Sequence, residues 1–349
     1  GISDVDFKAG INMDTYKYYI DFAADNHIEF VILDEGWYNP EKGDMLTVIP
    51  ELDLEELIRY GKSKGVDLIL WTVFNVLDEQ LEAACKKYSE MGISGFKVDF
   101  LDRDDQTAVE MTYRIADMTA KYKLTLDLHG FYKPTGLNRT YPNIINFEAV
   151  FGMEEMKWSS IQKDMMEYDV TMPYIRMMAG PVDYTPGAMR NASKKDFKDI
   201  YYNPMSQGTR CHQLAAYVVH DSPLTMLADN PTIYKREQEC TDFIISIPNK
   251  GIEETRVLQG KVGESIIMAR RAGTSWYIGG MTDWTAREIT LDFDFLDNGN
   301  YEVILFKDGI NADKQAEDYK QEQFTITPAS KKKIRMASGG GFAMTITKK

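Results

Sequence analysis

The feature that most constrains the fold is an alternation of amphipathic helical patterns with short apolar runs over roughly the first 240 residues. Runs rich in β-branched and aromatic residues, separated by helix-length segments, are typical of βα units around a parallel sheet. The pattern predicts helices over 14–26, 53–64, 78–91 and 107–121, and strands over 28–34, 66–71, 93–99, 124–129 and 144–148.

Two further apolar runs, at 170–178 and 223–228, bring the predicted strands to seven, one fewer than an eight-stranded (β/α)8 barrel requires. We therefore predict an α/β fold, a TIM-type barrel over 1–250 whose first strand would precede residue 1, as in the C-terminal part of a longer protein. From 251 to 349 short strands follow one another with turn signals, which predicts an all-β sandwich domain. We expect the charge run Lys331–Lys333 to be a solvated turn in that domain.

Composition excludes several classes of protein. With 40 Lys and Arg against 54 Asp and Glu, the net charge of −14 makes nucleic acid an improbable partner. No apolar run approaches the roughly 20 residues that a membrane span needs, and the first residues lack a signal-peptide pattern. The three cysteines are far apart, and none of the four histidines has a zinc-site spacing, so neither a disulfide framework nor zinc is expected.

The segment Gly95-Phe-Lys-Val-Asp-Phe100 is the most informative one for chemistry. Because side chains alternate along a strand, Lys97 and Asp99 share one face, opposite Phe96 and Val98. A lysine beside an aspartate at a barrel mouth favours the ionised carboxylate, which a glycosidase nucleophile must be. A buried structural ion pair is an equally good interpretation of the spacing alone.

Two glutamates follow in the segment 145–158. Glu148 closes a predicted strand, and Glu154 comes six residues later in a loop near Met153 and Trp158. Partial desolvation by such neighbours raises the pKa of a carboxylic acid and suits a general acid. Two unrelated, solvated loop glutamates are the alternative.

Candidate sugar contacts surround these carboxylates. Asp34 and Glu35 offer acceptors for hydroxyl groups, while Trp37 and Trp71 are expected to offer flat aromatic platforms, although a lone Trp is more often a core residue. His129 ends its strand and is taken as a substrate contact rather than a catalyst. The carboxyl ends of parallel strands meet at one rim of a barrel, so four residues are expected to converge there: Asp34, Asp99, His129 and Glu148.

Five motifs occurring in order resemble glycoside hydrolase family 97: DEGWY at 34–38, GFKVDF at 95–100, DLHG at 127–130, TGLNRTYPN at 135–143 and NFEAVFGMEE at 146–155. The KxD strand motif is also similar to that of the wider α-galactosidase clan. The resemblance covers essentially the whole chain and implies a catalytic barrel, a C-terminal β-domain, an oligosaccharide substrate and a periplasmic or secreted location.

The resemblance also implies a mechanism. Inverting α-glucosidases of the family carry a glutamate base directly after the histidine, where this sequence has Gly130, whereas retaining α-galactosidases have a nucleophile at the position of Asp99. The implied activity is that of a retaining exo-α-galactosidase acting on terminal α-linked galactose. Glu154 matches the general acid/base, and Glu148 matches a ligand of a calcium ion beside the site.

Two rival hypotheses stay open. An inverting α-glucosidase of the same family would need a base that Gly130 cannot provide. A non-catalytic sugar-binding fragment is the rival from another class, because a chain without the first strand would lack a complete barrel. The resemblance also implies a large N-terminal β-sandwich that adds a glutamate to the calcium site. We expect that domain as a missing partner segment.

Overall fold

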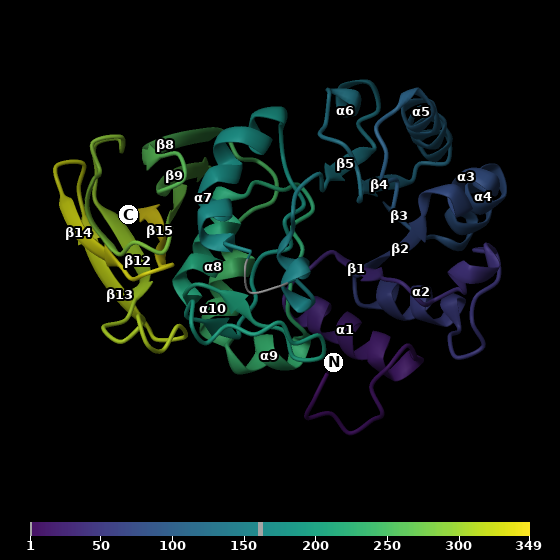
Figure 1. Ribbon diagram of the computed structural model, residues 1–349, viewed down its shortest axis with the longest axis horizontal. Coiled ribbons are helices and arrows are strands. Elements are labelled where there is room, and N and C mark those ends of the chain that lie inside the picture. The colour runs from purple at the N-terminus through teal and green to yellow at the C-terminus, as the bar shows by residue number, and fades with distance from the viewer. Residues whose placement is uncertain (1, 160–162) are drawn as a thin grey trace. The chain divides into compact units, whose positions relative to one another are not determined.

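The computed structural model describes residues 2–159 and 163–349 (Figure 1). Contacts divide the chain into two compact units, residues 1–150 with 179–183, and residues 151–178 with 184–349. Gly1, where the predicted barrel domain begins, lies outside the described residues. No helix in the described ranges has the length and apolar character that a bilayer crossing requires.

The first unit is built on a sheet of five parallel strands in sequence order. The strands are β1 Phe30–Leu33, β2 Asp67–Val73, β3 Gly95–Asp99, β4 Thr125–Leu128 and β5 Ile144–Phe147. The helices that alternate with them are α1 Met13–Asp25, α2 Leu54–Ser63, α3 Phe74–Glu79, α4 Leu81–Met91, α5 Gln106–Lys121 and the short α6 Leu137–Thr140, with a 3-10 turn η1 at Pro40–Lys42. Parallel neighbours in sequence order form the wall of a (β/α) barrel, so the predicted βα architecture is confirmed at this level.

Local signals explain where the helices begin. The side chains of Asn12, Asp53 and Asp105 accept the backbone N–H three residues later, at 2.9–3.0 Å, and so cap α1, α2 and α5. The single helix predicted over 78–91 is two helices, because the chain breaks at Gln80 between α3 and α4. Buried side chains such as Leu70 and Leu126 join sheet and helices in one apolar core.

Two predicted strands are wrong. The run 170–178 is the end of α7 Met165–Ile175 and the turn η3 Arg176–Ala179. An unbroken apolar run fits a buried helix as well as a strand, and Asp164 decides for the helix by accepting the Glu167 N–H at 3.1 Å. The run 223–228 belongs to no strand of the described residues. Ser222 Oγ donates a local hydrogen bond to the Leu224 carbonyl oxygen at 2.9 Å.

The second unit contains the predicted C-terminal all-β domain. A six-stranded antiparallel sheet runs in the order β13-β12-β15-β10-β9-β8, and β11 pairs with β14 in a second sheet. Side chains of both sheets share one buried apolar core. The strands are β8 Glu254–Lys261, β9 Ser265–Ala272, β10 Ser275–Thr282, β11 Arg287–Asp292, β12 Tyr301–Asp308, β13 Tyr319–Ile326, β14 Lys331–Met336 and β15 Gly341–Lys348.

The Lys331–Lys333 run is not a turn but the start of β14. Its charges are compatible with a strand because the partner strand β11 is acidic: Lys331 Nζ lies 2.7 Å from Asp292, and Lys333 Nζ lies 3.4 Å from Glu288. Cross-strand pairs of opposite charge stabilise antiparallel pairing.

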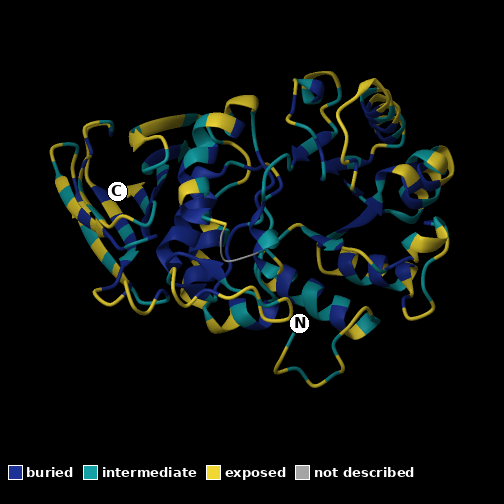
Figure 2. Ribbon diagram, in the orientation of Figure 1, coloured by how far each residue is buried: buried dark blue, intermediate teal, exposed yellow. Residues whose placement is uncertain are grey.

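A buried helix, α8 Arg210–Val219, packs against β9, β10 and β15 of the same unit (Figure 2). The approach is close at Gly279, where a Cβ atom would lie 2.6 Å from the Ala215 carbonyl oxygen. The domain boundary near residue 250 stays a prediction. The remaining elements of this unit are η2 Met153–Lys157, β6 Asn191–Ala192, β7 Ser206–Gln207, α9 Pro231–Arg236 and α10 Gln238–Ser246.

Candidate active site

The register of the parallel sheet fixes the candidate site. Lys97 of β3 pairs with Asp127 of β4, and side chains two residues further along each strand face the same side. Asp99 and His129 are therefore neighbours at the carboxyl ends of their strands, and Glu148 follows at the end of β5. Backbone bonds of 2.8 Å, from His129 N to Val98 and from Glu148 N to Leu128, continue the ladders to these positions.

Asp99 is a half-buried carboxylate held by two donors. Its Oδ1 accepts the Phe100 backbone N–H at 2.7 Å, and its Oδ2 accepts the Trp71 indole N–H at 3.1 Å. Phe100 has a φ of 58°, so the chain turns directly after Asp99, and Phe100 is 54% exposed. Fixed orientation with partial access is what a reacting carboxylate needs.

Lys97 and the acidic pair after β1 occupy the same edge of the sheet. The Lys97 side chain is buried, and its Nζ lies 3.8 Å from Asp34 Oδ1, whose side chain is 65% exposed. Glu35 is exposed beside it. Asp34 and Glu35 are therefore accessible to a hydroxylated ligand.

The prediction that Trp37 offers an exposed platform is wrong. Its ring is fully buried in the core, edge-on to Tyr38 and Tyr88, and its N–H donates to the Trp71 carbonyl at 2.7 Å. Trp71 is only 2% exposed, so it also has no open face, and only its N–H reaches Asp99. Burying a large apolar ring in the core lowers the free energy of the folded chain, and this explains why both Trp37 and Trp71 are buried.

His129 is the centre of a buried polar cluster. Its Nε2 donates to Asp183 Oδ2 at 2.6 Å and lies 3.5 Å from Asp127 Oδ2, while its Nδ1 faces Glu148 Oε1 at 3.5 Å. Asp183 reaches this place because its backbone N–H bonds the Phe147 carbonyl at the end of β5, at 2.8 Å. The histidine is thus oriented by carboxylates on both ring nitrogens.

These carboxylates control protonation. Burial and the Lys97 charge lower the pKa of His129, but Asp127 and Asp183 outweigh them and hold that pKa well above its ordinary value. Burial, followed by the Asp127 charge, raises the pKa of Asp183 to about 6, against the opposing effect of His129. The geometry and the charges agree on a histidinium that donates to Asp183.

Glu148 is fixed from the other side. The Gly130 backbone N–H donates to its Oε2 at 2.8 Å, and its side chain keeps 15% exposure. Gly130 has a φ of 53°, and a Cβ atom there would lie 2.9 Å from Asp102 Oδ1 and 3.0 Å from the Phe100 nitrogen. A side chain at Gly130 would therefore be strained by the positive φ and would require Asp102 and Phe100 to shift.

A group of metal-ligating side chains exists within the first unit. Ligand atoms of Asp127, His129 and Asp183 lie within 4.8 Å of one another, so this acidic and histidine cluster could hold a metal ion. The mixture of one imidazole and two carboxylates is unlike the all-oxygen shell that calcium prefers. The ion pairing already described leaves both Asp127 oxygens, Asp183 Oδ1 and His129 Nδ1 buried without a hydrogen-bond partner among the described residues. A calcium ligand in this unit is better sought at Glu148.

Glu154 belongs to the second unit, in η2. Its side chain is half-buried, next to the buried Met153, whose N–H bonds the Tyr184 carbonyl at 3.0 Å. Trp158 is 50% exposed, and its indole donates to Glu155 at 2.7 Å. Of these two apolar neighbours predicted for Glu154, Met153 is buried and Trp158 is exposed, so the predicted apolar environment is only partly present.

Sequence reasoning missed two residues of the cluster. Asp127 lies two residues before His129 on the same face of β4, so the alternation rule applied to Lys97 and Asp99 would have found it. Asp183 follows an irregular segment, and no local pattern places it beside β5.

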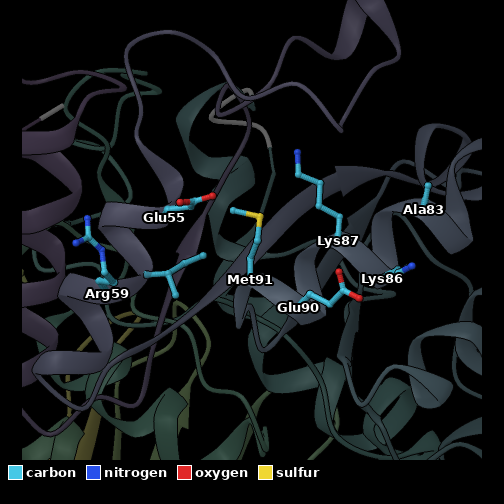
Figure 3. A pocket seen from close by; sticks show the side chains of 8 residues that line it. Glu55, Arg59, Ala83, Lys86, Lys87, Glu90 and Met91 are labelled. Atoms are coloured by element: carbon cyan, nitrogen blue, oxygen red, sulfur yellow. The ribbon is translucent and has the colours of Figure 1, made fainter.

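A hollow on the helical surface of the first unit lies apart from these residues (Figure 3). It is lined by side chains of α2 and α4, and none is a predicted site residue: Glu55, Ile58, Arg59, Ala83, Lys86, Lys87, Glu90 and Met91. The hollow is therefore not the candidate active site.

Two family descriptions match different parts of this chain. Residues 2–150 match glycoside hydrolase 97, and residues 251–347 match the family described as glycosyl-hydrolase 97 C-terminal, oligomerisation. The chain belongs to glycoside hydrolase family 97.

Individual relatives agree. A retaining alpha-galactosidase of Bacteroides thetaiotaomicron is 54% identical over 345 residues, which cover 99% of this chain and 52% of that protein. A probable retaining alpha-galactosidase of Streptomyces bingchenggensis is 28% identical and covers 86% of this chain and 45% of its own length. The chain thus spans about half the length of these curated relatives. A family 97 enzyme of Pseudoalteromonas sp. strain K8, solved with panose, has a TM-score of 0.88 and 28% identity over 98% of this chain and 57% of its own.

Proposed function

We propose that this chain carries the catalytic residues of a retaining exo-α-galactosidase that removes terminal α-linked galactose from oligosaccharides. The observation that carries the proposal is Asp99, a half-buried carboxylate at the end of β3 with one donor on each oxygen. The 54% identity to a retaining alpha-galactosidase supports the same assignment.

Asp99 would attack the anomeric carbon while Glu154 protonates the departing glycosidic oxygen. Glu154 would then take a proton from water, and that water would displace Asp99 from the covalent intermediate. Two inversions give net retention, and the two carboxyl groups of such a pair are about 5–5.5 Å apart, against roughly 6.5–9.5 Å in inverting enzymes.

Gly130 supports retention over the inverting α-glucosidase hypothesis. The resemblance implies that inverting members place their base at this position. Here a φ of 53° and close contacts with Phe100 and Asp102 disfavour any side chain. A base carboxylate would need a different backbone at this turn.

The remaining site residues take supporting roles in the proposal. Lys97 would present a charged donor to sugar hydroxyls, Asp34 and Glu35 would present acceptors, and Trp71 would orient Asp99 rather than stack on sugar. His129, expected from the sequence as a substrate contact, is 1% exposed and faces carboxylates with both ring nitrogens, so its proposed role is to position those carboxylates. Trp37 is withdrawn from the set, because its ring is buried.

We also propose Glu148 as one ligand of a calcium ion. Its oxygens are the hard donors that calcium prefers, its orientation is fixed by Gly130, and it keeps solvent exposure. When bound, the ion would supply positive charge beside the carboxylates. The resemblance implies a further glutamate ligand from an N-terminal β-sandwich, and a periplasmic or secreted location.

Replacing Asp99 tests the nucleophile. Asp99→Gly should abolish hydrolysis of aryl α-galactosides, and azide should restore turnover and give the β-galactosyl azide, because azide occupies the vacated face. Asp102→Gly is the matched control, since Asp102 is exposed at the same edge with a φ of 49° that glycine tolerates. An α-azide product, or near wild-type hydrolysis by Asp99→Gly, would overturn the assignment.

Two measurements on the unmodified protein separate the rivals. Proton NMR of the first-formed galactose shows the α-anomer for retention and the β-anomer for inversion. Calorimetry that detects galactoside binding with no turnover at high protein concentration would select the non-catalytic alternative.

A further inference from the structure

The second unit exposes three aromatic side chains, and they lie together. Among the described residues of that unit, Trp158, Tyr201 and Tyr202 are the only exposed aromatic side chains, at 50%, 58% and 80%. Ring centroids are 6.1 Å apart between Trp158 and Tyr201 and 5.1 Å apart between Tyr201 and Tyr202. We call these three residues the aromatic patch. Because its members come from two distant segments, the fold and not a local motif assembles it.

The patch is tied to the helix η2 that carries Glu154. The Trp158 N–H donates to Glu155 Oε2 at 2.7 Å, and Ser159 Oγ donates to the same oxygen at 3.3 Å. The indole N–H is thereby occupied by a carboxylate, while half of the Trp158 side chain stays exposed. Glu155 is the neighbour of Glu154, so the aromatic patch begins close to the proposed acid along the chain.

We propose that the aromatic patch binds the leaving-group sugars of the oligosaccharide substrate. The inference rests on the proposed function, since a general acid protonates the oxygen that stays with the leaving group, and those sugars must lie on the side of Glu154. Aromatic rings supply flat apolar faces for sugar C–H groups together with polar edges. The Tyr hydroxyls, and Lys157 with its Nζ 6.0 Å from the Trp158 ring centre, supply polar partners.

The size of the patch favours a sugar over a protein. Each aromatic side chain can bury about 150–250 Å², so three partly exposed rings offer well under the roughly 800 Å² that each side of a stable protein interface needs. One or two sugar rings match that area.

Comparing substrates that share the galactosyl group but differ in the leaving group isolates this role. For Trp158→Ala and Tyr201→Ala, kcat/KM on an α-galactosyl trisaccharide should fall about tenfold, mainly through KM. On α-galactosyl fluoride, which has no leaving-group sugar, it should stay within twofold of wild type. Trp158→Phe should recover most of the loss. Tyr113→Ala, an exposed tyrosine (47%) of the first unit, is the matched control and should change neither substrate.

Binding measurements keep the test independent of turnover. In an Asp99→Asn background, Trp158→Ala should weaken calorimetric binding of the trisaccharide about tenfold and leave galactose binding unchanged. Equal losses on both substrates, or unchanged trisaccharide KM and binding, would overturn the inference while leaving the activity assignment intact. A protein that never hydrolyses α-galactosyl fluoride would instead refute the proposed function, and the binding comparison would still decide the role of the patch.

Discussion

Trp71→Phe tests whether the indole N–H positions Asp99, the proposed nucleophile. The substitution keeps an aromatic ring in the core but removes the donor that lies 3.1 Å from Asp99 Oδ2. In the proposed mechanism negative charge would return to Asp99 when the covalent intermediate breaks down, so a donor to that carboxylate would contribute most in the second step. A hydrogen bond to a charged group contributes about 1.5–3 kcal/mol, and about 1.36 kcal/mol corresponds to tenfold in rate. We therefore expect kcat to fall by about 12- to 160-fold.

Rapid-mixing kinetics with an aryl α-galactoside measures this directly. Slower breakdown of the intermediate should produce a burst of the aryl leaving group, followed by a slow steady state. Trp37→Phe is the matched control, because Trp37 is equally buried and loses an N–H that donates to a backbone carbonyl rather than to Asp99. Both variants should lose stability, by less than the roughly 3–5 kcal/mol of a complete Trp→Ala truncation.

The positioning role is tested by the difference in kcat between Trp71→Phe and Trp37→Phe. Equal losses of kcat in Trp71→Phe and Trp37→Phe would assign the effect to core packing and refute the positioning role. A Trp71→Phe protein with kcat within twofold of wild type would show that the Phe100 N–H alone holds the carboxylate.

Three further outcomes are expected. Chelation should lower activity or melting temperature and calcium should restore it, whereas Glu148→Gln should respond to neither; an indifferent wild type would remove the calcium proposal. Asp183→Asn should lower the free energy of unfolding by about 1.5–3 kcal/mol, because His129 loses a charged acceptor at 2.6 Å; unchanged urea unfolding would contradict this. Burial raises the pKa of Asp308 to about 6 in spite of donors from Thr209, Ala337 and Gly341. The native state then binds more protons than the unfolded chain, whose Asp pKa is about 3.9, so stability should fall as pH rises from about 4 to 6. Relative to Asp308→Asn, urea unfolding should show that fall as roughly 3 kcal/mol, and a pH-independent difference would rule it out.

The sheet of the first unit could be predicted because local signals and global fold agree there. Each of β1 to β5 lies within its predicted run or extends it by at most two residues. The caps at Asp53 and Asp105 mark helix starts that the pattern places within one residue. Where side-chain alternation, helix capping and apolar periodicity all favour the same element, alternative structures are less stable, and the prediction is correct.

The errors occur where one pattern fits two structures. The apolar run 170–178 satisfies a helix and a strand alike, and the cap at Asp164 was the weaker but decisive signal. Trp37 sits beside Asp34 and Glu35, and such polar neighbours suggest exposure although the ring points into the core. Asp183 could not be found at all, because its place depends on a backbone bond to Phe147, 36 residues earlier in the chain, and on no local pattern.

Gly130 shows how a single position can join fold and chemistry. Its N–H fixes Glu148, its carbonyl accepts the Asp102 N–H at 2.8 Å, and its left-handed φ makes both bonds possible in one turn. An L-residue in that conformation costs about 1–2 kcal/mol. A Cβ atom at Gly130 would also lie 3.0 Å from the Phe100 nitrogen, which donates to Asp99. A side chain at Gly130 would therefore displace the backbone that orients the proposed nucleophile. In this chain the turn has a glycine at position 130 and an oriented carboxylate at Asp99, which is the arrangement that the proposed retaining mechanism requires.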